Sequence, residues 1–219
     1  MKRLIVYDLD GTLVDTLQDI TASANHMLQT LGRPPADPDA VRLFVGRGIR
    51  ALIQQCLGAG AGEADVDRAL AVYREHYGHH MLDTSRLYHG AYELLEHFDQ
   101  LGRTQAVITN KPNPYSTQIL TALGVSDRFV QIIGGDDGYP KKPDPASLLA
   151  LMAEADATPE QTILIGDSPV DIETGRRAGV LTAAVTHGLA TLEEVAAARP
   201  DATVSDFAQL AELARTQGW

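Results

Sequence analysis

Residues 4–16 of this 219-residue chain read LIVYDLDGTLVDT and are the clearest guide to its fold. Its apolar run at 4–8 ends in two aspartates, Asp8 and Asp10, and a Gly-Thr pair follows at once. A continuous apolar run, without polar alternation, is typical of a strand covered on both faces of a parallel sheet. Two neighbouring carboxylates repel each other, so this strand end calls for an explanation beyond folding alone.

Further apolar runs repeat the pattern along the chain, at 105–110, 130–135, 162–167, 182–188 and, more weakly, 202–206. Helical stretches separate them, at 91–102, 115–124, 146–156 and 171–179, and several end at a glycine, a common C-terminal stop. Alternating strands and helices predict an α/β fold, a doubly wound, Rossmann-like parallel sheet with helices on its faces.

The interval 15–82 contains no convincing strand. Apolar residues within 17–31 share one helical face, namely Leu17, Ile20, Ala24, Met27, Leu28 and Leu31. Residues 41–58 and 65–82 are predicted as further helices, joined by a flexible GAGAGE connection at 58–63. We therefore predict an α/β core domain of residues 1–14 and 83–219, with a helical cap domain of residues 15–82 inserted after the first strand. The cap is expected to lie over that strand's end as a lid.

Composition excludes several classes of function. The net charge of −11 argues against nucleic-acid binding, which needs a basic face, but a metal ion and a few lysines can still attract a small anion. No stretch approaches the roughly 18 apolar residues of a membrane span. A single cysteine, Cys56, and the lack of a signal-peptide pattern predict a cytoplasmic protein. A monomer and a homodimer both remain open.

Polar residues follow several predicted strands, at the edge where open parallel sheets bind ligands. They are Asp8 and Asp10, Thr109 and Asn110, the group Asp167, Ser168 and Asp171, and the doublet Lys141-Lys142. Any one aspartate can simply cap the next helix, and Asp15, Thr16 or Ser168 before Pro169 fit that interpretation. Capping does not explain two acidic clusters at two strand ends. A divalent cation would relieve their repulsion, and oxygen ligands without cysteine or histidine favour Mg²⁺ over Zn²⁺.

The motifs DLDGT, TN, KP and GDSPVD, each at a strand end and in this order, resemble those of the haloacid dehalogenase-like phosphatases. VGRGIR, GGDD, KKPDPASLL and GDSPVDIETGRRAG are similar to the phosphoglycolate phosphatase branch of that family. The resemblance covers nearly the whole chain. It implies a mobile helical cap after the first motif, which corresponds to residues 15–82.

The resemblance also implies a role for each motif residue. Asp8 is expected to be the nucleophile that forms an aspartyl-phosphate, and Asp10 the general acid and base. Thr109, with the Asn110 backbone, would bind the phosphoryl oxygens. Lys142, rather than Lys141 by the family pattern, would offset negative charge. Mg²⁺ would be held by Asp8, the Asp10 carbonyl and Asp167, while Asp171 would orient the metal's waters or Lys142.

The substrate is expected to be a small anionic phosphomonoester, foremost 2-phosphoglycolate. Gly46, Arg47 and Gly48 of the predicted cap could present a cation or backbone N–H groups to a substrate carboxylate, although Arg47 could equally be a solvated residue at a helix start. Alternatives are another small phosphomonoester such as a sugar phosphate or nucleotide, phosphoryl transfer of the phosphoglucomutase type, or a non-catalytic phosphate binder. Asp10 argues against a dehalogenase, whose halide leaves unprotonated. Phosphonate hydrolysis needs a cap lysine, and none occurs between Arg3 and Lys111.

Overall fold

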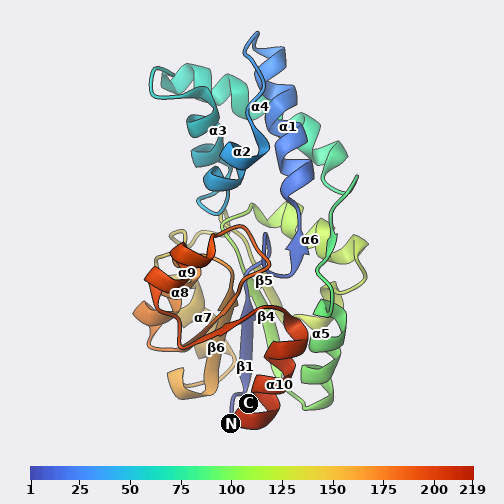
Figure 1. Cartoon of the computed structure of the whole chain (residues 1–219), viewed down its shortest axis with the longest axis vertical. Coiled ribbons are helices and arrows are strands. Elements are labelled where there is room, and N and C mark those ends of the chain that lie inside the picture. Colours follow the sequence, from blue (N-terminus) through green and yellow to red (C-terminus); the bar gives the residue numbers. More distant parts are fainter.

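A computed structural model describes all 219 residues and contains a six-stranded sheet in which every pairing is parallel (Figure 1). The strand order is β5-β4-β1-β6-β7-β8. The strands are β1 (Leu4–Tyr7), β4 (Thr104–Ile108), β5 (Gln131–Ile133), β6 (Thr162–Gly166), β7 (Leu181–Val185) and β8 (Ala202–Val204). β1 lies inside the sheet, between β4 and β6. The predicted α/β fold is confirmed.

Helices cover both faces of this sheet, which explains the continuous apolar runs. Leu4 and Val6 of β1 pack with α7 (Ala146–Glu154) and with Ala178 at the end of α8 (Pro169–Ala178). Ile5 and Tyr7 point to the opposite face, toward α5 (Ala91–Gln100), α6 (Asn113–Ala122) and α10 (Phe207–Gln217). α9 (Leu192–Ala198) packs beside α8. Two short 3₁₀ turns, Ser126–Arg128 and Pro159–Gln161, precede β5 and β6.

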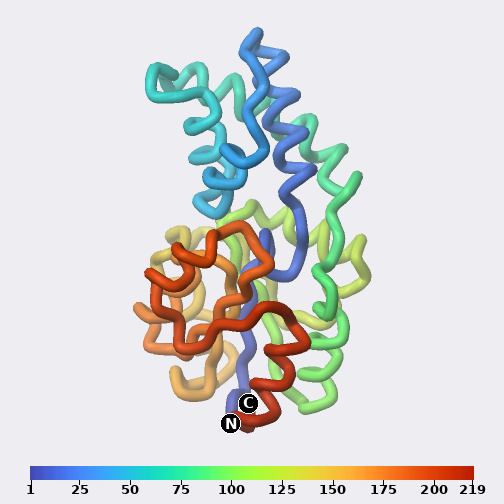
Figure 2. Tube along the Cα trace, viewed as in Figure 1, coloured from blue at the N-terminus to red at the C-terminus, as the bar shows by residue number.

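Four helices follow the first strand and form a block at one end of the molecule (Figures 1 and 2). They are α1 (Leu17–Thr30), α2 (Pro38–Phe44), α3 (Ile49–Leu57) and α4 (Glu63–His80). The chain enters and leaves this helical block through a small antiparallel ribbon of β2 (Val14–Asp15) and β3 (Arg86–Leu87). The block lies beyond the carboxyl end of β1, while both chain termini lie at the opposite end of the core (Figure 2).

The prediction of one helix over 41–58 is wrong. The structure has two helices there, α2 and α3, separated by a loop at Val45–Gly48. The loop contains two glycines with positive φ, 98° at Gly46 and 88° at Gly48, and side-chain-bearing residues rarely adopt this conformation. The apolar period continues across the loop, so periodicity alone did not reveal the break. The two-residue strands β2 and β3 were not predicted either, because they are too short to show a pattern.

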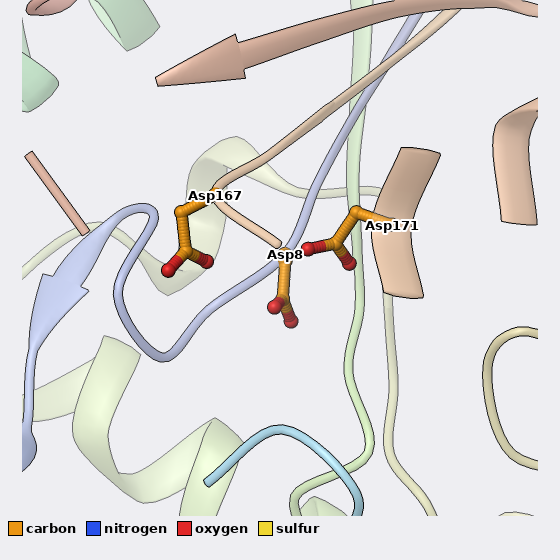
Figure 3. A group of neighbouring side chains, drawn as sticks. All are labelled: Asp8, Asp167 and Asp171. Carbon is orange, nitrogen blue, oxygen red and sulfur yellow. The ribbon is translucent and has the colours of Figure 1, made fainter. Parts of the chain in front are cut away.

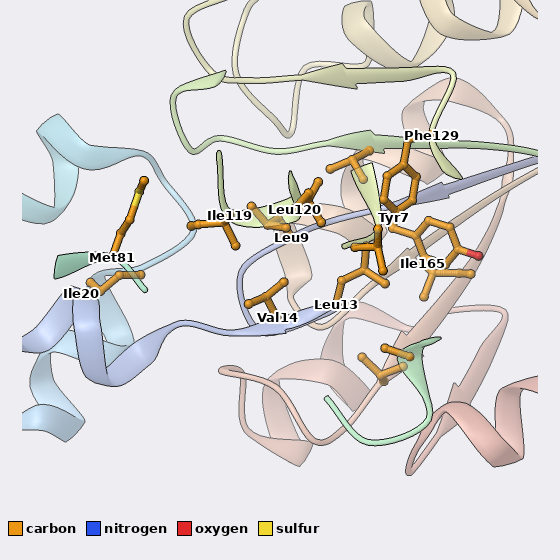
Figure 4. Close-up of a cluster of buried hydrophobic side chains, with 14 of the residues drawn as sticks. Tyr7, Leu9, Leu13, Val14, Ile20, Met81, Ile119, Leu120, Phe129 and Ile165 are labelled. Carbon is orange, nitrogen blue, oxygen red and sulfur yellow. The ribbon is translucent and has the colours of Figure 1, made fainter. Parts of the chain in front are cut away.

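One apolar cluster runs from the sheet into the helical block (Figure 4). Tyr7 and Ile165 belong to its sheet end, Leu13 and Val14 to the connection, and Ile20 of α1 to the block. This shared core means that the block packs on the sheet domain through buried apolar contacts at its base. None of the helices is both long and apolar enough to cross a membrane.

Candidate active site

Three buried aspartates converge at the carboxyl end of the sheet (Figure 3). Asp8 follows β1, Asp167 follows β6, and Asp171 lies in the first turn of α8. One carboxylate oxygen from each lies within 4.8 Å of those from the other two. β1 and β6 are adjacent and parallel, so their ends necessarily deliver Asp8 and Asp167 to the same place.

Lys142 is the cation of this cluster. Its Nζ lies 2.8 Å from Asp8 Oδ1, and it donates hydrogen bonds to Asp171 Oδ1 at 2.6 Å and to the Ile108 carbonyl at 3.0 Å. Two hydrogen bonds and the ion pair with Asp8 therefore hold the ammonium group in position. Lys141 is exposed, so the structure brings Lys142 and not Lys141 to the aspartates.

Asp171 and Asp167 are themselves held by hydrogen bonds. The second oxygen of Asp171 accepts from Ser168 Oγ at 2.6 Å and from the Ser168 N–H at 3.2 Å, and the latter is a capping-box contact at the start of α8. Asp167 accepts from Thr12 Oγ1 at 3.0 Å and from the Leu189 N–H at 2.6 Å. A Cβ on Gly11 would lie 2.4 Å from Asp167 Oδ2, so only glycine allows this approach.

The carboxylates carry more negative charge than their surroundings neutralise. Burial, reinforced by Asp171 and opposed by Lys142, raises the pKa of Asp8 to about 7. Burial, with Asp171 and Asp8, raises the pKa of Asp167 to about 8, against the hydrogen bonds from Leu189 and Thr12. Both shifts express the same cost, that of ionising buried carboxyl groups that lie close together beside one lysine.

A divalent cation fits this donor set. Every donor is a carboxylate oxygen, the group contains no cysteine or histidine, and hard cations such as Mg²⁺ prefer oxygen ligands. A doubly positive ion would offset both the cost of burying these charges and the repulsion between them, the two causes that raise the pKa values of Asp8 and Asp167. The acidic cluster therefore has the chemistry of a metal site.

Asp10 lies two residues beyond Asp8 but in a different environment. Its Oδ1 accepts hydrogen bonds from Thr16 Oγ1 at 2.7 Å and from Lys111 Nζ at 2.8 Å. Asp10 does not belong to the group of three aspartates. The two carboxylates of DLDGT thus have separate partners, Asp8 with Lys142 and Asp10 with Lys111, and are free to act differently.

Thr109 and Asn110 follow β4 and line one cavity with Asp8 and Asp10. The Asn110 side chain is fully engaged, since Oδ1 accepts from the Lys142 N–H at 2.8 Å while Nδ2 donates to the Lys142 carbonyl at 3.0 Å and the Gly46 carbonyl at 2.8 Å. No hydrogen bond in the structure uses the backbone N–H of Asn110. The side chain therefore positions its neighbours, and the backbone is available to a ligand.

The Val45–Gly48 loop lies over the site at the boundary of two cavities. Gly46 and Gly48 line the cavity that contains Thr109 and Asn110. Arg47 is exposed and lines the second one with Asp8 and Asp167. Arg47 makes no hydrogen bond or ion pair within the chain. The structure thus brings the three predicted loop residues to the aspartates, at the mouth of the site.

Sequence reasoning missed several residues that the structure places here. Lys111 directly follows the TN motif, and a lysine next to a predicted strand end was itself a usable signal. Thr16 was interpreted as a helix cap, but its hydroxyl bonds Asp10 and caps nothing. Thr12 of DLDGT holds Asp167. Three tyrosines of the cavity wall, Tyr73, Tyr77 and Tyr115, had no motif around them and left no comparable signal.

Comparisons with known proteins agree with this geometry. The family model for haloacid dehalogenase-like hydrolases matches residues 5–185. The chain is 38% identical to a phosphoglycolate phosphatase of Pseudomonas putida, over 96% of this chain and 79% of that protein. It is 32% identical to the phosphoglycolate phosphatase of Vibrio parahaemolyticus, over 96% of this chain and 95% of that one.

The fold also matches a solved structure. A crystal structure described as that of a predicted phosphoglycolate phosphatase from Haemophilus somnus superposes with a TM-score of 0.92 and 31% identity, and the match covers 97% of both chains. The family match spans most of the chain, including all three converging aspartates. The chain belongs to the haloacid dehalogenase-like hydrolase family.

Proposed function

We propose that this protein is a phosphatase that hydrolyses 2-phosphoglycolate to glycolate and phosphate. The observation that best supports this chemistry is that the two aspartates of DLDGT have different contact partners. Asp8 faces the acidic cluster and Lys142, while Asp10 is held apart by Thr16 and Lys111. The relatives named phosphoglycolate phosphatase support the substrate.

Asp8 acts as the nucleophile in this proposal. Its Oδ1 lies against Lys142, and its Oδ2, which accepts no hydrogen bond, attacks phosphorus. The new bond is an acyl phosphate on Asp8, and the ester bond to the leaving oxygen breaks. Thr109 and the free N–H of Asn110 bind the phosphoryl oxygens, and Lys142 offsets their charge.

Asp10 handles the proton in both halves of the reaction. The Oδ2 atom of Asp10 donates its proton to the leaving alkoxide, so that glycolate departs as an alcohol. The resulting carboxylate then takes a proton from water, which attacks the acyl phosphate and frees Asp8. Thr16 and Lys111 hold the other oxygen, Oδ1, and so keep the reactive oxygen directed at the substrate.

Mg²⁺ is the proposed cofactor, held by Asp8, the Asp10 carbonyl and Asp167. Asp171 orients Lys142 through their 2.6 Å contact. When bound, the ion supplies charge that lets an anionic nucleophile approach an anionic phosphate.

We also propose that residues 15–82 act as a cap domain on a core of residues 1–14 and 83–219, with Gly46, Arg47 and Gly48 closing over the substrate. The single cysteine supports a cytoplasmic location.

The test is phosphate release from a panel of 2-phosphoglycolate, a hexose phosphate and a nucleoside monophosphate. We expect kcat/KM to be at least about 10-fold higher for 2-phosphoglycolate, because a site that pairs a substrate charge discriminates strongly against substrates without it. Activity should vanish with EDTA and return with Mg²⁺. A higher kcat/KM for the hexose phosphate would identify a sugar phosphatase, and binding without turnover would identify a phosphate-binding protein.

A further inference from the structure

Lys111 is a buried lysine, and the proposed reaction uses only part of its capacity to donate hydrogen bonds. It follows Asn110 at the end of β4 and is 8% exposed. Its Nζ donates to Asp10 Oδ1 at 2.8 Å and lies 4.9 Å from the centre of the Tyr77 ring of α4. An ammonium group has three donors, and Asp10 occupies one of them. The other two have no acceptor in the protein.

The cavity beside Lys111 has a wall that is apolar and aromatic over much of its extent. It lies between α6 and the strand ends on one side and the helical block on the other. Its apolar and aromatic wall consists of Ile20, Val45, Ile49, Leu52, Pro112 and the tyrosines 73, 77 and 115. Lys111 is the only cation among its lining residues.

The position of Asp10 determines which part of a substrate enters this cavity. The leaving oxygen must lie within hydrogen-bond reach of the Asp10 carboxyl group to receive its proton. The atoms beyond that oxygen then extend away from phosphorus, past Asp10, where Lys111 holds the same carboxylate. In 2-phosphoglycolate a carboxylate follows the ester oxygen after one methylene group. A carboxylate at that distance falls beside an ammonium group bound to Asp10.

Arg47, the cation expected from the sequence, is less suited to this contact. It is exposed, and it lines the second cavity, which shares Asp8 and Asp10 with the first cavity but does not contain Lys111. A charge–charge contact is much weaker in water than in a site shielded by apolar walls. Lys111 is shielded in this way, by Tyr73 and Tyr77 among others, and Arg47 is not.

We infer that Lys111 recognises the carboxylate of the leaving group and thereby selects small phosphomonoesters that carry a carboxylate next to the ester carbon. This inference rests on the proposed function and deepens it. One ammonium group would bridge Asp10 and the substrate carboxylate, so that the acid and the leaving group are aligned by the same residue. A neutral substrate of equal size would leave two donors of a buried cation unpaired, which is costly.

The experiment measures kcat/KM for 2-phosphoglycolate and for 2-hydroxyethyl phosphate, a neutral analogue of similar size, at fixed Mg²⁺. We expect wild-type protein to prefer 2-phosphoglycolate, and Lys111→Met to reduce that preference by about 10- to 100-fold, the range expected for a hydrogen bond to a charged group. The loss should appear mainly as a higher KM for 2-phosphoglycolate. Lys111→Gln keeps a donor for Asp10 without charge and carries the test if the methionine variant does not fold.

Two comparison variants separate the explanations. Lys141→Met removes an exposed lysine and should leave both activity and preference at wild-type values. Arg47→Met removes the other candidate cation; any loss of activity should be equal on both substrates, so that the preference is kept. If the Lys111 variants lost activity equally on both substrates, Lys111 would only position Asp10 and the inference would be wrong. The same holds if Arg47→Met alone abolished the preference. A wild-type protein inactive on 2-phosphoglycolate would instead refute the proposed function itself.

Discussion

At the residue scale, Asp8 and Asp10 show how two identical side chains two positions apart acquire different properties. Asp8 is buried next to Asp171, and this raises its pKa despite the contact with Lys142. Asp10 has different partners and is bound by Thr16 and Lys111. Environment, rather than residue type, assigns the nucleophile and the acid in our proposal.

Asp8→Asn should abolish turnover without unfolding the protein. We expect kcat to fall by at least about 10³-fold, because loss of a covalent nucleophile removes the main route of catalysis. The metal-free variant should melt at or above the wild-type temperature at pH 8, since the substitution removes one of three crowded carboxylates while Lys142 keeps Asp171. Phosphate release and thermal melts measure the two effects. Near-normal turnover, or an unfolded variant, would contradict the assignment.

Much of the site could be predicted at this scale because strand ends in a parallel sheet share one edge. The sequence placed Asp8, Thr109, Asp167 and Lys142 together for that reason, and the structure brings them together. Lys111 was overlooked because a lysine after a strand is usually solvated. Only the folded chain shows α4 covering it with Tyr77.

At the element scale, Asp19 of α1 joins the two segments through which the chain enters and leaves the helical block. It is 2% exposed and accepts hydrogen bonds from the backbone N–H and the hydroxyl of both Thr84 and Ser85. Burial alone would raise the pKa of Asp19, but these hydrogen bonds outweigh burial and lower it. The ionised form is therefore favoured by folding.

Asp19→Asn should destabilise the protein at neutral pH and much less in acid. A folded-state pKa below the unfolded value contributes stability above about pH 4, and this contribution is lost as pH falls through the lowered pKa. We expect a loss of about 1–2 kcal/mol in the free energy of unfolding at pH 7, from weaker hydrogen bonds to a neutral acceptor. Denaturant unfolding of both proteins at pH 7 and pH 3 measures this.

The exposed Asp39 provides the control for this experiment. Its side chain is 93% exposed and 3.9 Å from Arg42, so Asp39→Asn should change stability by less than about 0.5 kcal/mol at either pH. If Asp19→Asn lowered the free energy of unfolding equally at pH 3, the shape of the side chain rather than its charge would account for the stabilising effect of Asp19.

The helices themselves were predictable to different degrees. α1 and α4 have apolar faces and few interruptions, and they formed where the sequence indicated. α2 and α3 share a continuing apolar period, and the break at Gly46 and Gly48 depends on backbone conformation that periodicity does not report. That break creates the loop over the active site, so the least predictable part of the helical block is also the part nearest the chemistry.

At the scale of the whole molecule, the active site needs both the sheet and the helical block. Asn110 after β4 bonds the carbonyl of Gly46 in the block, and the cavity beside Lys111 has walls from both parts. The sequence predicted a lid from the position of the insertion alone. The sequence contained no signal for the residues that form contacts between the block and the sheet, because each contact joins two positions that are far apart in the chain.

Arg42 of the block is linked to the acidic cluster through the loop that contains Leu189. Arg42 Nη1 of α2 donates to the carbonyl of Leu189, and the N–H of Leu189 donates to Asp167 at 2.6 Å. Arg42→Ala should therefore favour open arrangements of the block. Since such a bond contributes about 0.5–1.5 kcal/mol, we expect kcat/KM to fall by about 2- to 10-fold and hydrogen exchange to accelerate at residues 45–52.

Arg50→Ala is the matched control for Arg42→Ala. Arg50 lies on α3 and pairs only with Glu63 and Asp67, within the block, so its loss should leave both kinetics and exchange near wild-type values. Equal behaviour of the two variants would show that the Leu189 contact does not couple block and core. A specific effect of Arg42 would instead mean that closing the block and ordering Asp167 are one event, because both depend on the loop that contains Leu189.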